Sequence, residues 1–114
     1  MTEQIAKVSM AIILHAGDAR NACKEVFEAI SIADFDLART RLEEGRKKIA
    51  EAHKIQTDII QDEAQGKESE YSLLFSHAQD TLMTVNSEIN TARQLLKIFE
   101  SYDMRLKKLE SKAR

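Results

Sequence analysis

The feature that most limits how this chain can fold is an apolar line with an alternating spacing of four and three residues. In the first part of the chain the line consists of small or apolar residues: Ile5, Ser9, Ile12, Ala16, Ala19, Cys23, Val26 and Ile30. Residues three or four positions apart lie on one side of an α-helix, so the line predicts a helix over residues 3–32. The heptad spacing also predicts that this helix packs along another helix at a shallow angle.

Two later segments carry the same spacing. In residues 35–64 the line consists of Ala38, Leu42, Gly45, Ile49, Ala52, Gln56, Ile59 and Glu63. In residues 70–111 it consists of Leu74, Ala78, Thr81, Val85, Glu88, Ala92, Leu95 and Phe99, broadened by Leu82, Ile89 and Leu96. The chain contains no proline, and no segment has the alternation typical of a β-strand. We therefore predict an all-α fold, an antiparallel up-down-up bundle of three helices in one domain spanning residues 1–114.

Particular residues mark the ends of these helices. Asp34 suits the N-cap of the second helix, because its carboxylate can accept from the free N–H groups of the next turn. Gly66 suits the position after that helix, and Ser69 suits the N-cap of the third. Gly17 lies inside the first helix, where glycine costs about 1 kcal/mol relative to alanine, so we expect a close neighbour or a slight bend there.

The third helix carries a second line beside the first. Its members are Leu73, His77, Asp80, Thr84, Thr91 and Ile98. A helix inside one three-helix bundle needs a single contact face, so the second line predicts oligomerisation through the third helix.

Charge and cysteine content argue against several classes of protein. The 17 Lys and Arg nearly balance 19 Asp and Glu, and the tail from Arg105 to Arg114 fits a solvated helix end better than a nucleic-acid arm. The single cysteine, Cys23, cannot form an intrachain disulfide, and its place on the apolar line indicates a small buried side chain. No apolar run approaches the roughly 20 residues that span a bilayer, and no signal peptide is recognisable. We expect a soluble, cytoplasmic protein.

His77 is the strongest candidate for chemistry. Asp80 lies three residues later, so an imidazole and a carboxylate project from one side of the helix, one turn apart. A neutral imidazole is a nucleophile that can accept a phosphoryl group and release it, and a helix edge is accessible to partner proteins. The alternative is a structural histidine that fills the edge of the bundle, and the spacing alone leaves that alternative open.

Asp80 also has two interpretations. Alone it is a surface carboxylate, whereas in an oligomer interface several copies would meet and would require a bound divalent cation or raised pKa values. The chain has no Gly-rich phosphate loop and no hydrolase motif. His15, His53 and His77 come from three different helices, but nothing in their spacing favours a zinc site.

Three segments resemble one known family. The run His77-Ala-Gln-Asp80-Thr-Leu-Met83-Thr84 resembles the active-site segment of the lactose/cellobiose-specific enzyme IIA proteins of the bacterial phosphoenolpyruvate-dependent sugar phosphotransferase system. Residues 16–20, Ala-Gly-Asp-Ala-Arg, resemble the first-helix motif of that family, and residues 51–57 resemble its second-helix motif. The three segments occur in the family's order and with fitting spacing, and the resemblance covers nearly the whole chain.

The resemblance implies a three-helix bundle that trimerises into a nine-helix assembly. It implies that His77 accepts a phosphoryl group, expected on its tele nitrogen, from the histidine-containing phosphocarrier protein. His77 would pass this group to a cysteine of enzyme IIB, which phosphorylates a disaccharide of the lactose, cellobiose or chitobiose type during its import by the membrane component IIC. Gln79 would support the site. Asp80 would meet its copies near the trimer axis and hold one divalent metal, Mg²⁺, per trimer.

One position departs from the family. Members commonly carry a second histidine four residues after the first, where this chain has Thr81. A hydroxyl can donate a hydrogen bond but carries no positive charge at neutral pH. The alternatives to the phosphocarrier are a non-catalytic helical adaptor, with His77 structural, and a metal-binding regulatory bundle that uses Asp80.

Overall fold

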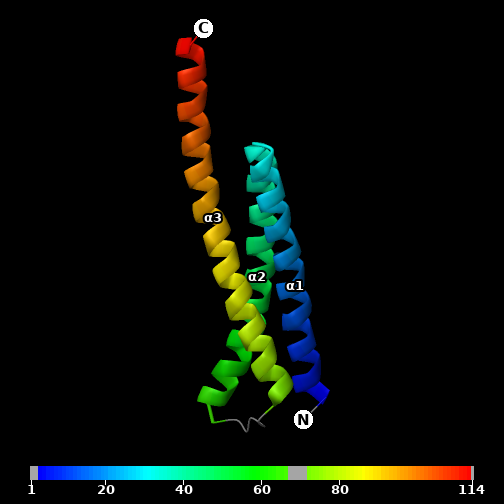
Figure 1. The fold of residues 1–114 in the computed structure, drawn as a ribbon. Coiled ribbons are helices and arrows are strands. Elements are labelled where there is room, and N and C mark those ends of the chain that lie inside the picture. The colour runs from blue at the N-terminus through cyan, green and yellow to red at the C-terminus, as the bar shows by residue number, and fades with distance from the viewer. Residues whose placement is uncertain (1–2, 67–71, 114) are drawn as a thin grey trace.

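Three long helices make up the fold (Figure 1). The computed structural model describes residues 3–66 and 72–113, and within them the helices are α1 (Glu3–Ser31), α2 (Phe35–Ala64) and α3 (Leu73–Ala113). The chain runs up through α1, down through α2 and up again through α3, so that α1 and α3 point the same way. The described residues contain no strand. The predicted all-α, up-down-up bundle is confirmed.

The predicted apolar lines of α1 and α2 form the core. Most of their members are buried: Ser9, Ile12, Ala16, Ala19, Cys23 and Val26 in α1, and Ala38, Leu42, Gly45, Ile49, Ala52 and Gln56 in α2. Gly45 lies where the helices approach closely, because a Cβ atom there would lie 2.7 Å from Ile89 Cδ1 and 3.4 Å from Ala22 Cβ. Small residues on α2 therefore let the three helices pack tightly.

The core face of α3 is centred differently from the prediction. Its buried residues are Ala78, Leu82, Val85, Ile89, Ala92 and Leu96. Thr81, Glu88 and Leu95, which the predicted line included, are only half-buried on its flank. The reason is that α3 packs against both α1 and α2, so its core face is centred on the residues that point between these two helices. All six members of the second line on α3 are exposed, so they lie apart from the core of the single chain. The oligomerisation predicted from this line stays a prediction.

Two of the predicted caps are confirmed. Asp34 Oδ1 accepts from the Leu37 N–H at 3.1 Å, and Gly66 follows the C-cap residue Gln65 of α2 with a φ of 84°. The predicted start of α3 near residue 70 is wrong, because the Ser72 hydroxyl accepts from the Phe75 N–H at 3.2 Å and α3 begins at Leu73. Ser69 lies outside the described residues.

Gly17 has no close neighbour among the residues that the structure describes. A Cβ atom at this position would meet nothing within 4 Å, and the residue is exposed on α1. The close contact that would explain this glycine is therefore not found among the described residues.

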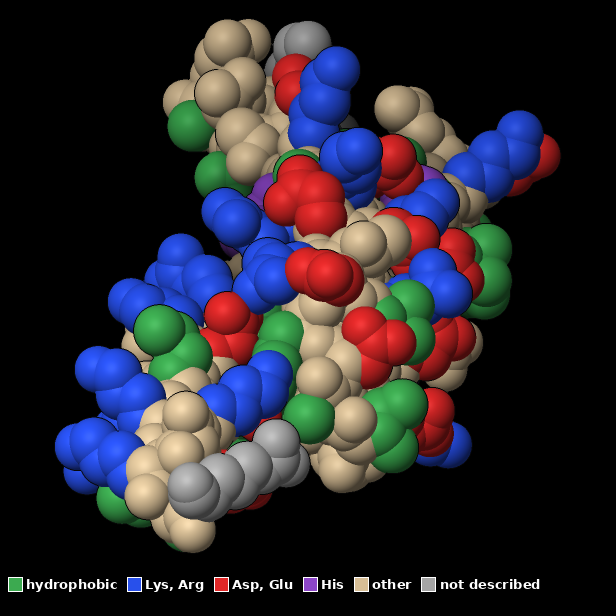
Figure 2. Space-filling view, turned by 90° about the horizontal axis from the view of Figure 1, so that it is seen from above, with side chains coloured by type: hydrophobic (Ala, Val, Ile, Leu, Met, Phe, Trp, Pro, Cys, Tyr) green, Lys and Arg blue, Asp and Glu red, His purple; other side chains and the backbone are tan. Residues whose placement is uncertain are grey.

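The molecule is long and narrow, with extents of 70 × 21 × 18 Å. Much of the length comes from α3, which continues past the turn between α1 and α2 (Figure 1). We call residues 101–113 of α3 the overhang. Viewed from above, charged side chains of both signs cover the outside, and Lys and Arg gather on one side (Figure 2). None of the described helices is long and apolar enough to cross a membrane.

Candidate active site

His77 lies in the second turn of α3, four residues after the first residue of that helix, and its side chain is exposed. The Ser72 cap determines this position, because it starts the helix at Leu73. In an α-helix the Cα–Cβ bond is tilted toward the N-terminus. The imidazole therefore projects back toward the first turn of α3.

Two side-chain contacts define which flank of α3 carries His77. Glu88 accepts from the Arg20 guanidinium of α1 at 3.1 and 3.2 Å, and Gln79 accepts from the Gln56 amide of α2 at 3.1 Å. His77 and Glu88 are 11 residues apart, which corresponds to three turns and about 20° of rotation. His77 consequently lies on the flank of α3 that faces α1.

The same pairing gives the height of His77 in the bundle. His77 lies 11 residues before Glu88 on α3. Because α1 and α3 run in the same direction, the position on α1 at the level of His77 lies about 11 residues before Arg20. That position is next to Met10. Met10 and Leu14 are exposed on α1, with 46% and 63% of their surface accessible. An exposed apolar patch thus lies on the neighbouring helix at the level of the imidazole.

Gln79 connects two of the sequence segments. Its partner Gln56 is 9% exposed and belongs to the second-helix motif. Gln79 lies two residues from His77, about 200° around the helix, so it contacts α2 rather than the imidazole. The geometry of Gln79 fits a residue that holds α3 against α2 close to His77.

Thr81 uses its hydroxyl within the helix. The Thr81 Oγ1–H donates to the backbone carbonyl of His77 at 2.9 Å. The residue that replaces the family's second histidine is therefore hydrogen-bonded to the backbone directly under the candidate nucleophile.

Asp80 is exposed and has no hydrogen bond or ion pair to His77 within the described part of the chain. Within the described part of one chain the two residues therefore do not form a His–Asp dyad. The described residues also contain no group of three His, Cys, Asp or Glu side chains that could hold a metal ion. Carboxylate oxygen is the donor that Mg²⁺ prefers, so Asp80 could supply one ligand, with others coming from water or from other copies of the chain.

The first-helix motif has a structural role in a single chain. Ala16 and Ala19 are buried, and Arg20 pairs with Glu88, which lies about 16 Å along α3 from His77. The pairing of Arg20 with Glu88 escaped the sequence prediction, because periodicity within one helix carries no information on cross-helix partners.

The other two histidines do not join His77. His15 is half-buried on α1, and its Nδ1 lies 3.1 Å from Glu51 Oε2 of α2 without the alignment of a hydrogen bond. His53 is exposed on α2.

Cys23 is buried, as predicted, and its Sγ lies 3.7 Å from the Glu88 carbonyl oxygen. Burial raises the pKa of the thiol, the Glu88 carboxylate raises it further, and Arg20 lowers it. A thiol held protonated in the core is a poor nucleophile.

Comparisons with known proteins agree with the three segments. Residues 7–100 match the family model described as the PTS system lactose/cellobiose-specific IIA subunit. The chain is 37% identical to the lactose-specific EIIA component of Lacticaseibacillus casei, over 96% of this chain and 95% of that relative. It is 34% identical to the lichenan-specific phosphotransferase enzyme IIA component of Bacillus subtilis, over 88% of this chain and 91% of that one.

Solved structures agree as well. PtcA from S. mutans superposes with a TM-score of 0.85 at 33% identity, covering 88% of this chain and 98% of that chain. IIA(chitobiose), from its complex with HPr in the Escherichia coli phosphotransferase system, superposes with a TM-score of 0.77 at 27% identity, covering 90% and 99%. The three-helix fold with an exposed histidine is thus that of a phosphoryl carrier of the sugar phosphotransferase system. The chain belongs to the lactose/cellobiose-specific IIA family.

Proposed function

We propose that His77 is the residue that carries the phosphoryl group. A ring nitrogen of His77 attacks the phosphorus of the phosphohistidine on the histidine-containing phosphocarrier protein, HPr, and the N–P bond to the donor breaks as the new one forms. The acceptor is a cysteine thiolate of enzyme IIB, in the cytoplasm, during uptake of a lactose-, cellobiose- or chitobiose-type disaccharide. The exposure of His77 on a firmly packed helix is the observation that carries this proposal, because both partners must reach the same nitrogen.

The position of His77 near the start of α3 supports the chemistry. The phosphorylated histidine carries a negatively charged group, and the first N–H groups of a helix lack partners within it and favour anions. Leu73 and Leu74 supply these groups one turn before His77. The helix N-terminus is therefore our candidate for the positive electrostatic field that a second histidine would provide at position 81.

The apolar patch on α1 supports docking of a partner. Met10 and Leu14 are exposed at the level of His77, on the helix that faces its flank. Interface cores are enriched in exposed apolar side chains of this kind. The related IIA(chitobiose) was solved in complex with HPr. We propose that HPr covers this patch while its phosphohistidine meets His77.

We further propose a homotrimer that buries the second face of α3. Leu73 and Ile98 are 74% and 47% exposed in one chain, and they lie at the two ends of that face. Asp80 lies on the same face, so three copies would bring three carboxylates together. These carboxylates would hold one divalent cation, Mg²⁺, whose charge offsets their mutual repulsion.

Phosphorylation of the purified chain tests the assignment of His77. Incubation with phosphoenolpyruvate and the two general phosphotransferase proteins should add about 80 Da, the mass of one phosphate, and acid should remove it. His77→Ala should remain unlabelled. His53→Ala is the matched control, since His53 is also exposed, and it should be labelled like the wild type. Acid-labile label on His77→Ala would refute the assignment, and an unlabelled wild type would favour the adaptor.

A further inference from the structure

The overhang carries an apolar stripe that no other helix of the described chain covers, although the Arg105 guanidinium lies over the Tyr102 ring, 5.3 Å from its centroid. Tyr102, Leu106 and Leu109 are 53%, 55% and 63% exposed, and Phe99 precedes them at the same spacing. The positions 99, 102, 106 and 109 are separated by three, four and three residues, which is the a/d spacing of a coiled coil. The stripe is thus patterned for another helix.

Charges of opposite sign border the two sides of this stripe. With Phe99 and Leu106 at a and Tyr102 and Leu109 at d, the e positions are Asp103 and Glu110, and the g positions after Tyr102 are Arg105 and Lys112. One border is therefore acidic and the other basic. In coiled coils the e and g charges decide which helix pairs with which, and in which direction.

We infer that the overhang pairs with the overhangs of other copies of this chain, parallel and in register. In a parallel coiled coil a g residue faces the e residue five positions later on its neighbour, which matches Arg105 with Glu110 of the partner subunit. An antiparallel arrangement would place g beside g and e beside e, so that like charges would face each other. Within one helix, residues 105 and 110 are about 140° apart and do not interact.

The stripe continues the face that we propose for the homotrimer. Thr84 and Tyr102 are 18 residues apart, which is five full turns, so they lie on the same side of α3. Leu73 and Leu109 are likewise separated by ten full turns. The family match ends at residue 100, so the stripe extends this face beyond the matched region.

The inference rests on the proposed homotrimer, because the homotrimer would stabilise the pairing of the overhangs. Two heptads alone are short, but subunits already joined through the rest of α3 would hold the overhangs at a high effective concentration. The direction of pairing rests on the charges of the overhang itself.

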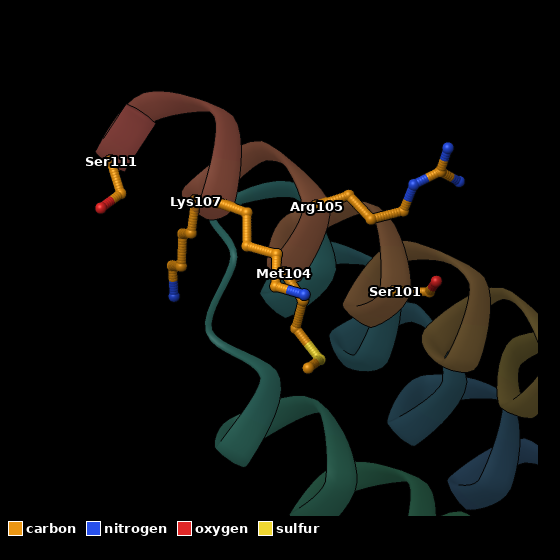
Figure 3. A pocket seen from close by; sticks show the side chains of 6 residues that line it. Ser101, Met104, Arg105, Lys107 and Ser111 are labelled. Atoms are coloured by element: carbon orange, nitrogen blue, oxygen red, sulfur yellow. The ribbon is translucent and has the colours of Figure 1, made fainter. Parts of the chain in front are cut away.

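An anionic membrane surface is a poorer occupant of the stripe. An open pocket on one side of the overhang is lined by Ser101, Met104, Arg105, Lys107, Lys108 and Ser111. The side chain of Arg105 extends away from that of Met104 (Figure 3). A helix that inserts its apolar stripe into lipid would bring both charged borders to the anionic headgroups. The headgroups would attract Arg105 and Lys112 but repel Asp103 and Glu110, whereas a parallel partner overhang offers an opposite charge to each border.

Disulfide trapping tests the direction of pairing in the full-length chain. In a Cys23→Ala background, Leu109→Cys introduces a thiol on the stripe, and Ser111→Cys introduces one on the opposite side of the helix. A disulfide needs Cα atoms within about 7 Å, and only parallel pairing in register brings two copies of residue 109 that close. Mild oxidation at micromolar concentration should yield covalent dimers of Leu109→Cys and leave Ser111→Cys monomeric on denaturing gels.

A charge swap tests the Arg105–Glu110 pairing. Both substitutions are made in the Cys23→Ala, Leu109→Cys background. Each of Arg105→Glu and Glu110→Arg alone should slow the formation of the covalent dimer. The two together should restore the rate seen with Arg105 and Glu110 in place. Restoration requires an interchain pair, because the two residues do not meet within one helix.

Four outcomes would overturn the inference. The first is that Leu109→Cys forms no covalent dimer although it sediments as a trimer and is phosphorylated on His77. This outcome would leave the proposed function intact. The second is equal dimer formation by Ser111→Cys. The third is cosedimentation of the protein with phosphatidylglycerol vesicles, lost in Leu106→Ser, without any crosslink. A wild-type chain that sediments as a monomer would overturn the inference and the homotrimer together, while labelling of His77 would still report on the phosphocarrier.

Discussion

Three neighbouring residues on α3 have three separate roles. His77 is exposed toward the flank that faces α1, Gln79 hydrogen-bonds to α2, and Thr81 hydrogen-bonds to the backbone carbonyl of His77. The sequence singled out His77, and the resemblance to a known family, rather than helix geometry, gave Asp80 a separate role, since residues three positions apart project from one side of a helix. It could not assign Thr81, since the bond of a hydroxyl to the carbonyl four residues earlier depends on a rotamer that the sequence does not specify.

Thr81→Val should leave phosphoryl transfer almost unchanged. Because the hydroxyl already donates to the His77 carbonyl, its removal takes no hydrogen bond from the phosphoryl group. We expect the rate of labelling of His77 to change by less than about threefold, or about 0.7 kcal/mol in activation free energy. Rapid-quench labelling with phosphorylated HPr measures this rate. A loss of tenfold or more would mean that Thr81 contacts the phosphoryl group after all.

Cys23 should make the folded state less stable at alkaline pH. Burial raises the pKa of its thiol above the ordinary 9.0, so the unfolded chain loses this proton at a lower pH than the folded chain does. Its contribution is present below the unfolded pKa and is lost as the pH rises toward the folded pKa. Urea unfolding of the wild type and of Cys23→Ala should therefore give a stability difference that shifts in favour of Cys23→Ala above pH 9.0. A pH-independent difference would contradict the burial of the thiol.

At the scale of helices, the sequence was informative about which segments are helical and which sides of α1 and α2 are buried. It was less informative about α3, where Thr81, Glu88 and Leu95 were expected in the core line and lie on its flank. Periodicity identifies an apolar side to within one neighbouring position, but it cannot specify the direction from which two other helices approach. The start of α3 was predicted too early for a different reason, because both Ser69 and Ser72 are acceptable caps in sequence.

Gly45 should be far less tolerant of substitution than Gly17. A Cβ atom at Gly45 would lie 2.7 Å from Ile89 Cδ1, so Gly45→Leu should lower the free energy of unfolding by about 1–3 kcal/mol through overpacking. Gly17→Ala should raise it by about 0.5–1 kcal/mol, because a Cβ atom there meets nothing within 4 Å and alanine is the better helix former. Both values come from urea unfolding at one protein concentration. Equal effects at the two sites would show that the helices approach less closely around Gly45.

At the scale of the whole molecule, the single chain leaves one complete face of α3 without a partner. Every member of the second line is exposed, including the apolar Leu73 and Ile98. The sequence predicted this face from periodicity, and the resemblance then suggested three copies. Neither could give the position of Asp80 relative to its copies, because that distance depends on how the subunits dock.

Divalent metal should control the assembly through Asp80. At neutral pH three carboxylates in one place repel each other, so removal of the cation should weaken the trimer. Sedimentation in Mg²⁺ should give about three times the 13.0 kDa of one chain, and EDTA should shift the wild type toward smaller species. Asp80→Asn should sediment alike in both buffers, whereas Asp58→Asn, an exposed carboxylate on α2, should behave as the wild type. Identical profiles of the wild type in Mg²⁺ and EDTA would remove the metal from the proposal.

The continuity of α3 has a consequence for building larger proteins from this fold. One uninterrupted helix joins His77 to Ala113, and these residues are separated by about 54 Å along its axis. A fluorophore, an affinity tag or a second domain fused at the C-terminal end of α3 would therefore be remote from the histidine. A fusion before α1 would stand at the level of His77, since that helix begins at the same end of the bundle (Figure 1). Modular fusions that keep the histidine accessible to two successive partners should accordingly be joined at the C-terminal end.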